Sequence, residues 1–138
     1  MRHISVLIVE DSVYSADLDV REIKKAGFTV DYYRVISGKS MLEALQENKC
    51  DIILSDNSLP NFDALQALEI RNKFNRSIPF IIVSEYVSDE DMIRALNNGC
   101  NGYITKENLI ELREMMKCFL WHLMMYIKCN INKKINYK

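Results

Sequence analysis

The chain has 138 residues, which is enough for one ordinary domain and too few for two full ones. Its hydrophobic fraction of 49% and charged fraction of 27% are typical of globular proteins and exclude a largely disordered chain. The formal net charge is only −1, but residues 1–121 contain all 19 acidic residues and 14 of the 18 Lys and Arg residues, so an acidic body precedes a basic end.

Short β-type segments alternate with helical patterns through the first half of the chain. Residues 4–9 form a nearly all-apolar strand, and the apolar spacing from Val13 is helical until Gly27, a residue typical of a helix end. Residues 28–35 alternate between apolar and polar side chains, which favours an edge strand. Ser37 is placed to cap a second helix.

The second half of the chain repeats this alternation. Residues 51–55 form a third strand, and a loop and a helix follow it. Residues 79–83 form a fourth strand, after which Ser88 begins an acid-rich helix that Gly99 ends. Residues 102–105 form a short fifth strand, and a long last helix follows.

Five strand–helix pairs predict an α/β fold, a doubly wound parallel (βα)₅ sheet with helices on both faces. The three apolar strands belong in the centre and the second and fifth at the edges, which corresponds to the flavodoxin-like strand order 2-1-3-4-5. We expect this domain to span residues 1–127 and a basic, loosely ordered tail to span residues 128–138.

The cysteine positions and the N-terminal sequence indicate the cellular compartment of the protein. The four cysteines, at positions 50, 100, 118 and 129, form no Cys-x-x-Cys metal or redox pair. The N-terminus has no signal-peptide pattern, and no apolar run is long enough to cross a membrane. The sequence therefore predicts a cytoplasmic protein with reduced thiols and no membrane partner.

Polar side chains follow the predicted strands at the edge where open parallel sheets bind ligands. They are Glu10 and Asp11 after the first strand, Asp56 after the third, Ser84 after the fourth and Lys106 after the fifth. Three carboxylates and one ammonium leave a net charge of −2, which is self-repelling unless a divalent cation binds. Oxygen ligands of this kind suit Mg²⁺, and a carboxylate beside Mg²⁺ and Lys is a plausible nucleophile toward phosphorus.

Four segments carry these residues in matching surroundings: IVEDS over residues 8–12, ILSDNSLPNFD over 53–63, FIIVSEY over 80–86 and GYITK over 102–106. Through them the sequence resembles the receiver domain of two-component response regulators, of the chemotaxis-regulator type. The resemblance covers about residues 3–121. Parts of the sequence, such as residues 55–68 and 106–109, are also similar to receiver domains within multidomain sensor kinases. A second interpretation is therefore that the chain is a segment of a longer protein.

The resemblance implies a signalling switch that accepts a phosphoryl group on Asp56 from a histidine kinase or phosphotransfer domain, as in a phosphorelay. Glu10 and Asp11 would hold Mg²⁺ together with the Asp56 carboxylate and the backbone carbonyl of Ser58. Such a protein assists its own phosphorylation and dephosphorylation, and it is not otherwise an enzyme.

The resemblance also implies roles for residues of the fourth and fifth strands. Ser84 would be the hydroxyl that moves to the phosphoryl group, Lys106 would pair with the same group, and Tyr103 would be the aromatic switch. Glu85 stands where the family usually has a small residue, so we expect Glu85 and Tyr86 to modulate access to the site.

Partners and alternatives follow from the same reasoning. We expect a downstream protein, or a second copy, to bind the face of the fourth helix, fifth strand and last helix, where residues 115–127 are rich in apolar side chains. Direct nucleic-acid binding is not expected of this chain, since the roughly ten residues after the last predicted helix cannot hold a DNA-binding domain. A degenerate receiver that acts only as a protein-interaction module is the alternative. The acidic Glu10-Asp11-Ser12 loop argues against a flavin carrier, and Asp11-Ser12-Val13 lacks the aspartate pair of aspartate-nucleophile phosphatases.

Overall fold

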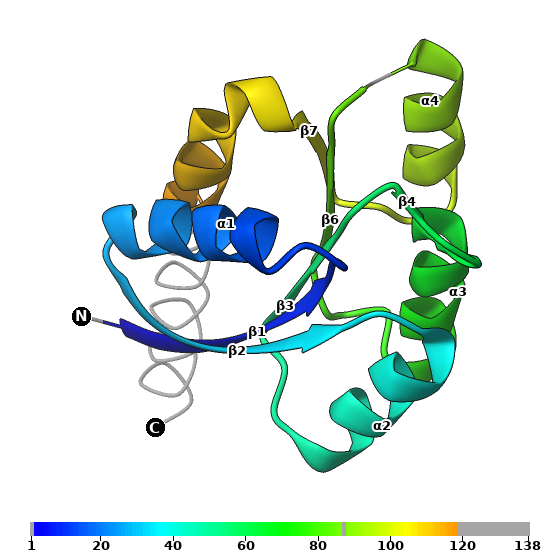
Figure 1. The fold of residues 1–138 in the computed structure, drawn as a ribbon, viewed down its shortest axis with the longest axis horizontal. Helices are drawn as coiled ribbons and strands as arrows, with labels where there is room; N and C mark the ends of the chain where they lie inside the picture. The colour runs from blue at the N-terminus through cyan, green and yellow to red at the C-terminus, as the bar shows by residue number, and fades with distance from the viewer. Residues whose placement is uncertain (1, 87, 119–138) are drawn as a thin grey trace, which may run out of the picture.

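A five-stranded parallel sheet forms the centre of the computed structural model, which describes residues 2–86 and 88–118 (Figure 1). Its strands are β1 (Arg2–Val9), β2 (Phe28–Val35), β3 (Ile52–Ser55), β6 (Phe80–Ser84) and β7 (Gly102–Thr105). They lie in the order β2-β1-β3-β6-β7. Counted along the chain within this sheet, the order is 2-1-3-4-5, so the predicted doubly wound α/β fold is confirmed.

Helices cover both faces of the sheet (Figure 1). They are α1 (Val13–Lys25), α2 (Gly38–Glu47), α3 (Ala64–Phe74), α4 (Asp89–Asn97), a 3₁₀ turn over Lys106–Asn108 and a last helix over residues 110–118. None of the helices in the described ranges is long and apolar enough to cross a bilayer. The predicted boundary between residues 127 and 128 lies outside the described residues, as does most of the apolar stretch 115–127.

The alternation of side chains along β1 explains why the strand is apolar on both faces. Leu7 and Val9 pack into the core beneath α2, α3 and α4, whereas Ile4, Val6 and Ile8 pack into the core beneath α1 and the last helix. Both faces are therefore removed from water, as in other doubly wound sheets. β2 lies at the edge, and most of its inner positions are exposed or only half-buried.

The predicted helix ends are confirmed by their caps. The hydroxyls of Ser12, Ser37 and Ser88 accept hydrogen bonds from the first-turn N–H groups of α1, α2 and α4. Gly27 and Gly99 follow α1 and α4 with φ of 104° and 96°, a region that favours glycine. These ends determine where each following strand begins.

A small hairpin occupies the segment after β3, where the sequence predicted only a loop. It consists of β4 (Ser58–Leu59) and β5 (Phe62–Asp63), which pair antiparallel. Pro60 and Asn61 form the turn, and Asn61 has a φ of 63°, which asparagine tolerates better than most residues. The hairpin buries Leu59 and Phe62 against the α2–α4 side of the core and so anchors the chain just after Asp56.

A buried arginine ties three segments together on this side of the sheet. Arg71 of α3 is only 2% exposed, and its guanidinium donates to the carbonyls of Arg76 (3.0 Å), Ile78 (2.7 Å) and Gly99 (2.5 Å). The guanidinium also lies over the Phe80 ring, 5.8 Å from its centroid. Backbone carbonyls thus take the place that a carboxylate would usually have beside a buried arginine.

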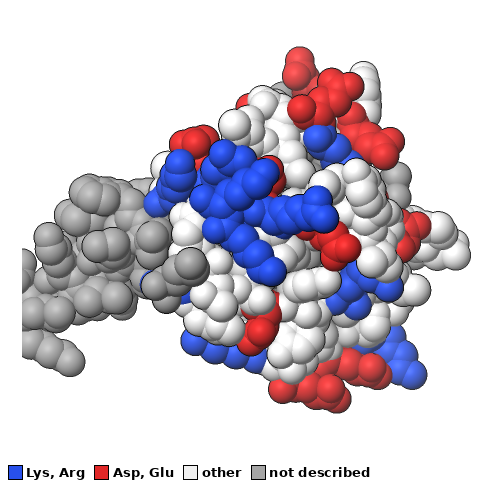
Figure 2. All heavy atoms as spheres, turned by 60° about the vertical axis from the view of Figure 1, so that its left-hand side comes forward, with Lys and Arg blue, Asp and Glu red and all other residues white. Residues whose placement is uncertain are grey.

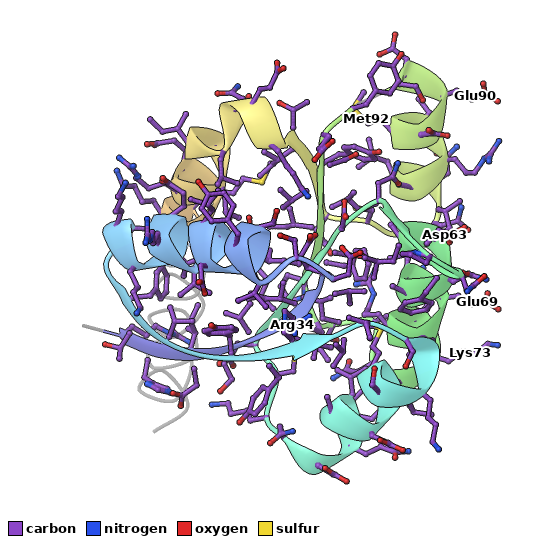
Figure 3. The ribbon with its side chains drawn as sticks, viewed as in Figure 1. Arg34, Asp63, Glu69, Lys73, Glu90 and Met92 are labelled. Carbon is purple, nitrogen blue, oxygen red and sulfur yellow. The ribbon has the colours of Figure 1, made fainter. Side chains whose placement is uncertain are left out.

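We predict that Arg71→Met lowers the free energy of unfolding by about 2–4 kcal/mol, because it leaves buried carbonyls without a donor. Lys73→Met on the same helix is the matched control, since Lys73 lies on the outer side of α3 and pairs only with exposed Glu69 (Figure 3). The control should change the stability by no more than about 0.5 kcal/mol. Urea denaturation measures both. Equal stability of the two variants would contradict this role of Arg71.

Candidate functional site

Three acidic side chains meet at the edge of the sheet where the strands end. Glu10 and Asp11 directly follow β1, and Asp56 directly follows β3. Because β1 and β3 are neighbours and Val9 pairs with Ser55, the residues after them are brought side by side. Ligand oxygens of the three carboxylates all lie within 4.8 Å of one another. The predicted acidic cluster is therefore present.

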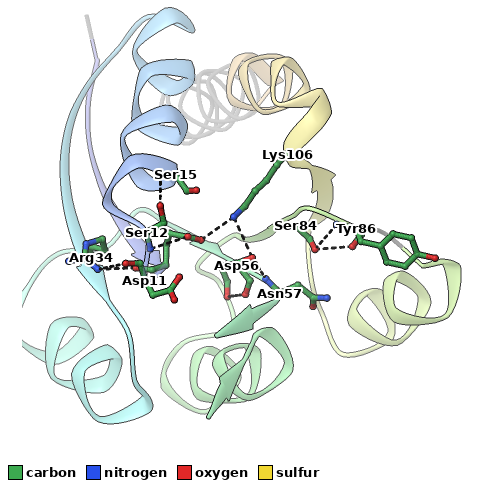
Figure 4. A network of polar contacts seen from close by, with 11 residues as sticks. Asp11, Ser12, Ser15, Arg34, Asp56, Asn57, Ser84, Tyr86 and Lys106 are labelled. Atoms are coloured by element: carbon green, nitrogen blue, oxygen red, sulfur yellow. Dashed lines mark hydrogen bonds and ion pairs between the residues drawn. The ribbon is translucent and has the colours of Figure 1, made fainter. Parts of the chain in front are cut away.

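Lys106 places a cation directly beside the carboxylates of this cluster. Its Nζ lies 3.5 Å from Glu10 Oε2 and 3.7 Å from Asp56 Oδ1 (Figure 4). The Glu10 side chain is 4% exposed and that of Asp56 is 14% exposed, so water screens these contacts only weakly. One ammonium faces three carboxylates, which leaves the negative excess that the sequence predicted.

The negative charge of the cluster helps to raise the pKa of Glu10. Burial, followed by the nearby Asp56 charge, raises the pKa of Glu10 to about 7, although Lys106 acts in the opposite direction. The Ser12 N–H also donates to Glu10 Oε1 (3.2 Å). Near neutral pH the single Lys106 ammonium therefore does not balance the negative charge of the acids, and a divalent cation would supply the missing positive charge.

Backbone contacts that the sequence did not indicate hold the acids in place. Arg34 reaches from β2 and donates to the carbonyls of Glu10 (3.1 Å) and Asp11 (3.4 Å) (Figure 3). The Asn57 N–H donates to Asp56 Oδ1 (2.8 Å). Only the strand register, which pairs Arg34 with residue 8 of β1, brings this arginine to the site.

The hydroxyl of Ser84 is engaged within its own loop. Ser84 is the last residue of β6, whereas the sequence predicted that the strand ends at residue 83 and that Ser84 follows it. Its Oγ donates to the Tyr86 carbonyl (2.8 Å) and accepts from the Tyr86 N–H (3.3 Å). Figure 4 shows the Tyr86 ring pointing away from Asp56, and this side chain is 74% exposed. Tyr86 therefore contacts Ser84 through its backbone.

Tyr103 and Glu85 lie near the same rim but make few polar contacts. Tyr103 is half-buried on β7, and its buried hydroxyl lies near that of Ser84, although the two do not meet the geometry of a hydrogen bond. Burial is the main reason that the pKa of Tyr103 is raised. Glu85 is exposed, and Ser58 begins β4 two residues beyond Asp56. All predicted site residues therefore lie on or near one edge of the sheet.

The sequence profile of the response regulator receiver domain matches residues 6–117. The chain belongs to this family. A curated relative, the transcriptional regulatory protein KdpE of Staphylococcus aureus, is 35% identical over 117 residues, which cover 81% of this chain and 48% of KdpE. The chain thus spans about half the length of that relative.

Solved receiver structures agree with this assignment. The CheY-like receiver domain protein of Methanospirillum hungatei has a TM-score of 0.74 at 26% identity, covering 89% of this chain and 98% of that chain. The Mn²⁺-bound form of the response regulator Rcp1 has a TM-score of 0.66 at 26% identity, covering 83% of this chain and 89% of that chain. Receiver domains are phosphoacceptor switches that bind Mg²⁺ at an acidic pocket, and the three carboxylates of this chain fit such an ion.

The raised pKa values of two buried acids predict how the stability of the metal-free receiver domain depends on pH. Glu10, and Asp19 on α1, have folded-state pKa values of about 7 against ordinary values of 4.5 and 3.8. Between about pH 4 and pH 7 the folded protein therefore binds more protons than the unfolded chain, so its stability falls as pH rises. We expect a loss of roughly 2–4 kcal/mol between pH 5 and pH 8 in chelator-treated protein.

Thermal unfolding across this pH range is the measurement. Millimolar Mg²⁺ should recover much of the lost stability at pH 8, because it binds only the folded site. Glu10→Gln should flatten the pH dependence in the absence of metal. A melting temperature of the metal-free protein that stays constant or rises from pH 5 to pH 8 would contradict the raised pKa values of Glu10 and Asp19.

Proposed function

We propose that this receiver domain accepts a phosphoryl group on Asp56 from the phosphohistidine of a histidine kinase or phosphotransfer domain, in an Mg²⁺-dependent reaction. The observation that carries the proposal is the position of the Asp56 carboxylate, which lies beside both Lys106 and the two acids that follow β1. The Mn²⁺-bound form of Rcp1 supports a divalent cation in a related protein. We also propose a cytoplasmic location, because Cys50 and Cys100 are free thiols and reduced cysteines are typical of the cytosol.

The two oxygens of Asp56 have different surroundings. Oδ1 accepts from the Asn57 N–H and faces Lys106, whereas Oδ2 has no hydrogen bond within the described residues. We assign the attack on phosphorus to Oδ2. An O–P bond forms, the P–N bond to the donor histidine breaks, and its electron pair leaves with the imidazole. The product is an acyl phosphate on Asp56.

The surrounding side chains act on charge during this transfer. Glu10, Asp11, the other Asp56 oxygen and the Ser58 carbonyl would hold Mg²⁺, which when bound offsets the charge of the acids and of the transferred oxygens. Lys106 is already beside Asp56 and needs only a small movement to pair with a phosphoryl oxygen. The same groups would assist the later attack of water.

The switch would work through Ser84 and Tyr103. To reach a phosphoryl group, the Ser84 hydroxyl must exchange its two contacts with the Tyr86 backbone for one charged acceptor. The Tyr103 hydroxyl is already buried on this side of β7, and we expect its ring to shift when the Ser84 hydroxyl moves. A downstream protein or a second copy would read the face of α4, β7 and the last helix, where Ile93 and Leu96 are exposed.

Asp56→Asn should abolish incorporation of phosphoryl groups from acetyl phosphate in the presence of Mg²⁺, because an amide oxygen is not a nucleophile of this kind. Intact-protein mass spectrometry counts the groups added. Asp89→Asn, which removes an exposed carboxylate from the first turn of α4, is the control and should incorporate one group as the wild type does. Unchanged incorporation in Asp56→Asn would refute the acceptor assignment. Absence of incorporation in the wild type would favour a degenerate receiver.

Glu85→Ala should accelerate phosphorylation by acetyl phosphate about twofold to fivefold, because it removes bulk and a like charge from the approach of an anionic donor. Tyr86 is expected to affect access through its backbone contacts with Ser84. The control is Glu90→Ala, an exposed acid on α4 that pairs with Arg94. Initial rates at low salt distinguish the two variants. Equal rates for both would show that Glu85 does not control access.

A further inference from the structure

Positively charged side chains from two helices gather on one side of the molecule, where Figure 2 shows a group of Lys and Arg residues. We call five of them the basic face. They are Arg21, Lys24 and Lys25 in the last turns of α1, and Arg113 and Lys117 on the last helix. All are exposed except Arg113, which is half-buried.

One carboxylate joins the two helices at the basic face. Glu22 Oε2 lies 2.8 Å from Arg113 Nη2, and Glu22 Oε1 lies 3.5 Å from Lys25 Nζ. The Glu22 side chain is 14% exposed, whereas that of Lys25 is 58% exposed. The cations of α1 and of the last helix therefore belong to a single surface, with the acid beneath them.

The basic face has more positive charge than its acids balance. Glu22 is one acid in contact with it, and Glu114, 3.5 Å from Lys117, is the other among the described residues. Within the same residues, Arg21 and Lys24 have no ion pair. Five cations and two acids leave a net charge of +3 on a domain that is otherwise acidic. Cations in the last turn of a helix offset the helix dipole, but this accounts for only two of the five. The excess favours an anionic partner.

The sequence that follows the basic face indicates which kind of anion this partner presents. Eight of the nine residues from 119 to 127 are apolar or aromatic, and residues 128–138 contain four Lys and no acid. Aromatic and apolar side chains beside lysines are typical of segments that bind at the surface of an anionic membrane. A nucleic-acid duplex offers phosphates but no apolar layer for such side chains. Binding at a membrane surface requires no spanning segment.

We propose that the basic face binds the surface of an anionic membrane and that residues 119–127 contribute apolar contacts to the lipid interface. This replaces the expectation of no membrane partner, which rested on the lack of a spanning run. The binding does not depend on the proposed phosphotransfer. α1 begins beside the acidic site and ends at the basic face, and its 13 residues span about 20 Å. Asp56 would therefore remain accessible to a phosphodonor while the protein is bound.

The test is sedimentation of the full chain with vesicles of phosphatidylcholine alone or with about 30% phosphatidylglycerol. We expect binding to the mixed vesicles at low salt, weaker binding as the salt concentration rises, and little binding to phosphatidylcholine alone. The double variant Arg21→Gln, Lys24→Gln should bind the mixed vesicles about fivefold to thirtyfold more weakly, because two cations near the lipid surface are lost.

The matched control is Lys39→Gln, Lys73→Gln, which removes the same charge from α2 and α3 on the other face of the sheet. It should bind the mixed vesicles within about twofold of the wild type. Equal weakening in the two double variants would overturn the proposal, as would failure of the wild type to sediment with the mixed vesicles. Binding to duplex DNA without binding to vesicles would overturn the assignment of the partner.

Fluorescence gives a second measurement, because Trp121 is the one tryptophan of the chain. Its emission should shift to shorter wavelength when the mixed vesicles are added, and unchanged emission in vesicle-bound protein would overturn the part assigned to residues 119–127. Acetyl phosphate should label Asp56 equally in the wild type and both double variants. Loss of lipid binding with normal labelling would leave the proposed function intact.

Discussion

The repulsion among three carboxylates at one sheet edge is the constraint on which the rest of the site depends. Adjacent strands β1 and β3 bring Glu10, Asp11 and Asp56 together, and the hydrophobic cores on both faces of the sheet prevent them from separating. Lys106 offsets part of the charge, and Arg34 steadies the backbone carbonyls. The remaining excess favours a cation at this edge of the sheet, and we propose that transfer of an anionic phosphoryl group depends on one.

Much of this arrangement can be predicted from the sequence, because parallel strands place their ends at the same edge. Three nearly continuous apolar strands indicate the centre of the sheet, and the polar residues directly after them are then neighbours. This reasoning predicts that Glu10, Asp56 and Lys106 are neighbours, and the structure brings them together. The strand order followed from the same alternation, since parallel connections leave few topologies.

The remaining features depend on information that periodicity does not carry. Asp19 looks like an ordinary polar residue until the rotation of α1 turns it toward the core, and Arg34 reaches the site only in one strand register. The hairpin over residues 58–63 has strands of two residues, too short for any alternation to be recognised. The contacts between Ser84 and the Tyr86 backbone depend on a loop conformation that residue types alone do not specify.

The most direct test of the central claim is to locate the phosphoryl group chemically. The protein is incubated with acetyl phosphate, with Mg²⁺ or with chelator, and then treated with borohydride, which reduces an aspartyl phosphate to homoserine. Peptide mass spectrometry then identifies the altered residue. The account predicts homoserine at position 56 in the Mg²⁺ sample and little in the chelator sample. Conversion at position 10 or 11, or equal conversion without the metal, would contradict it.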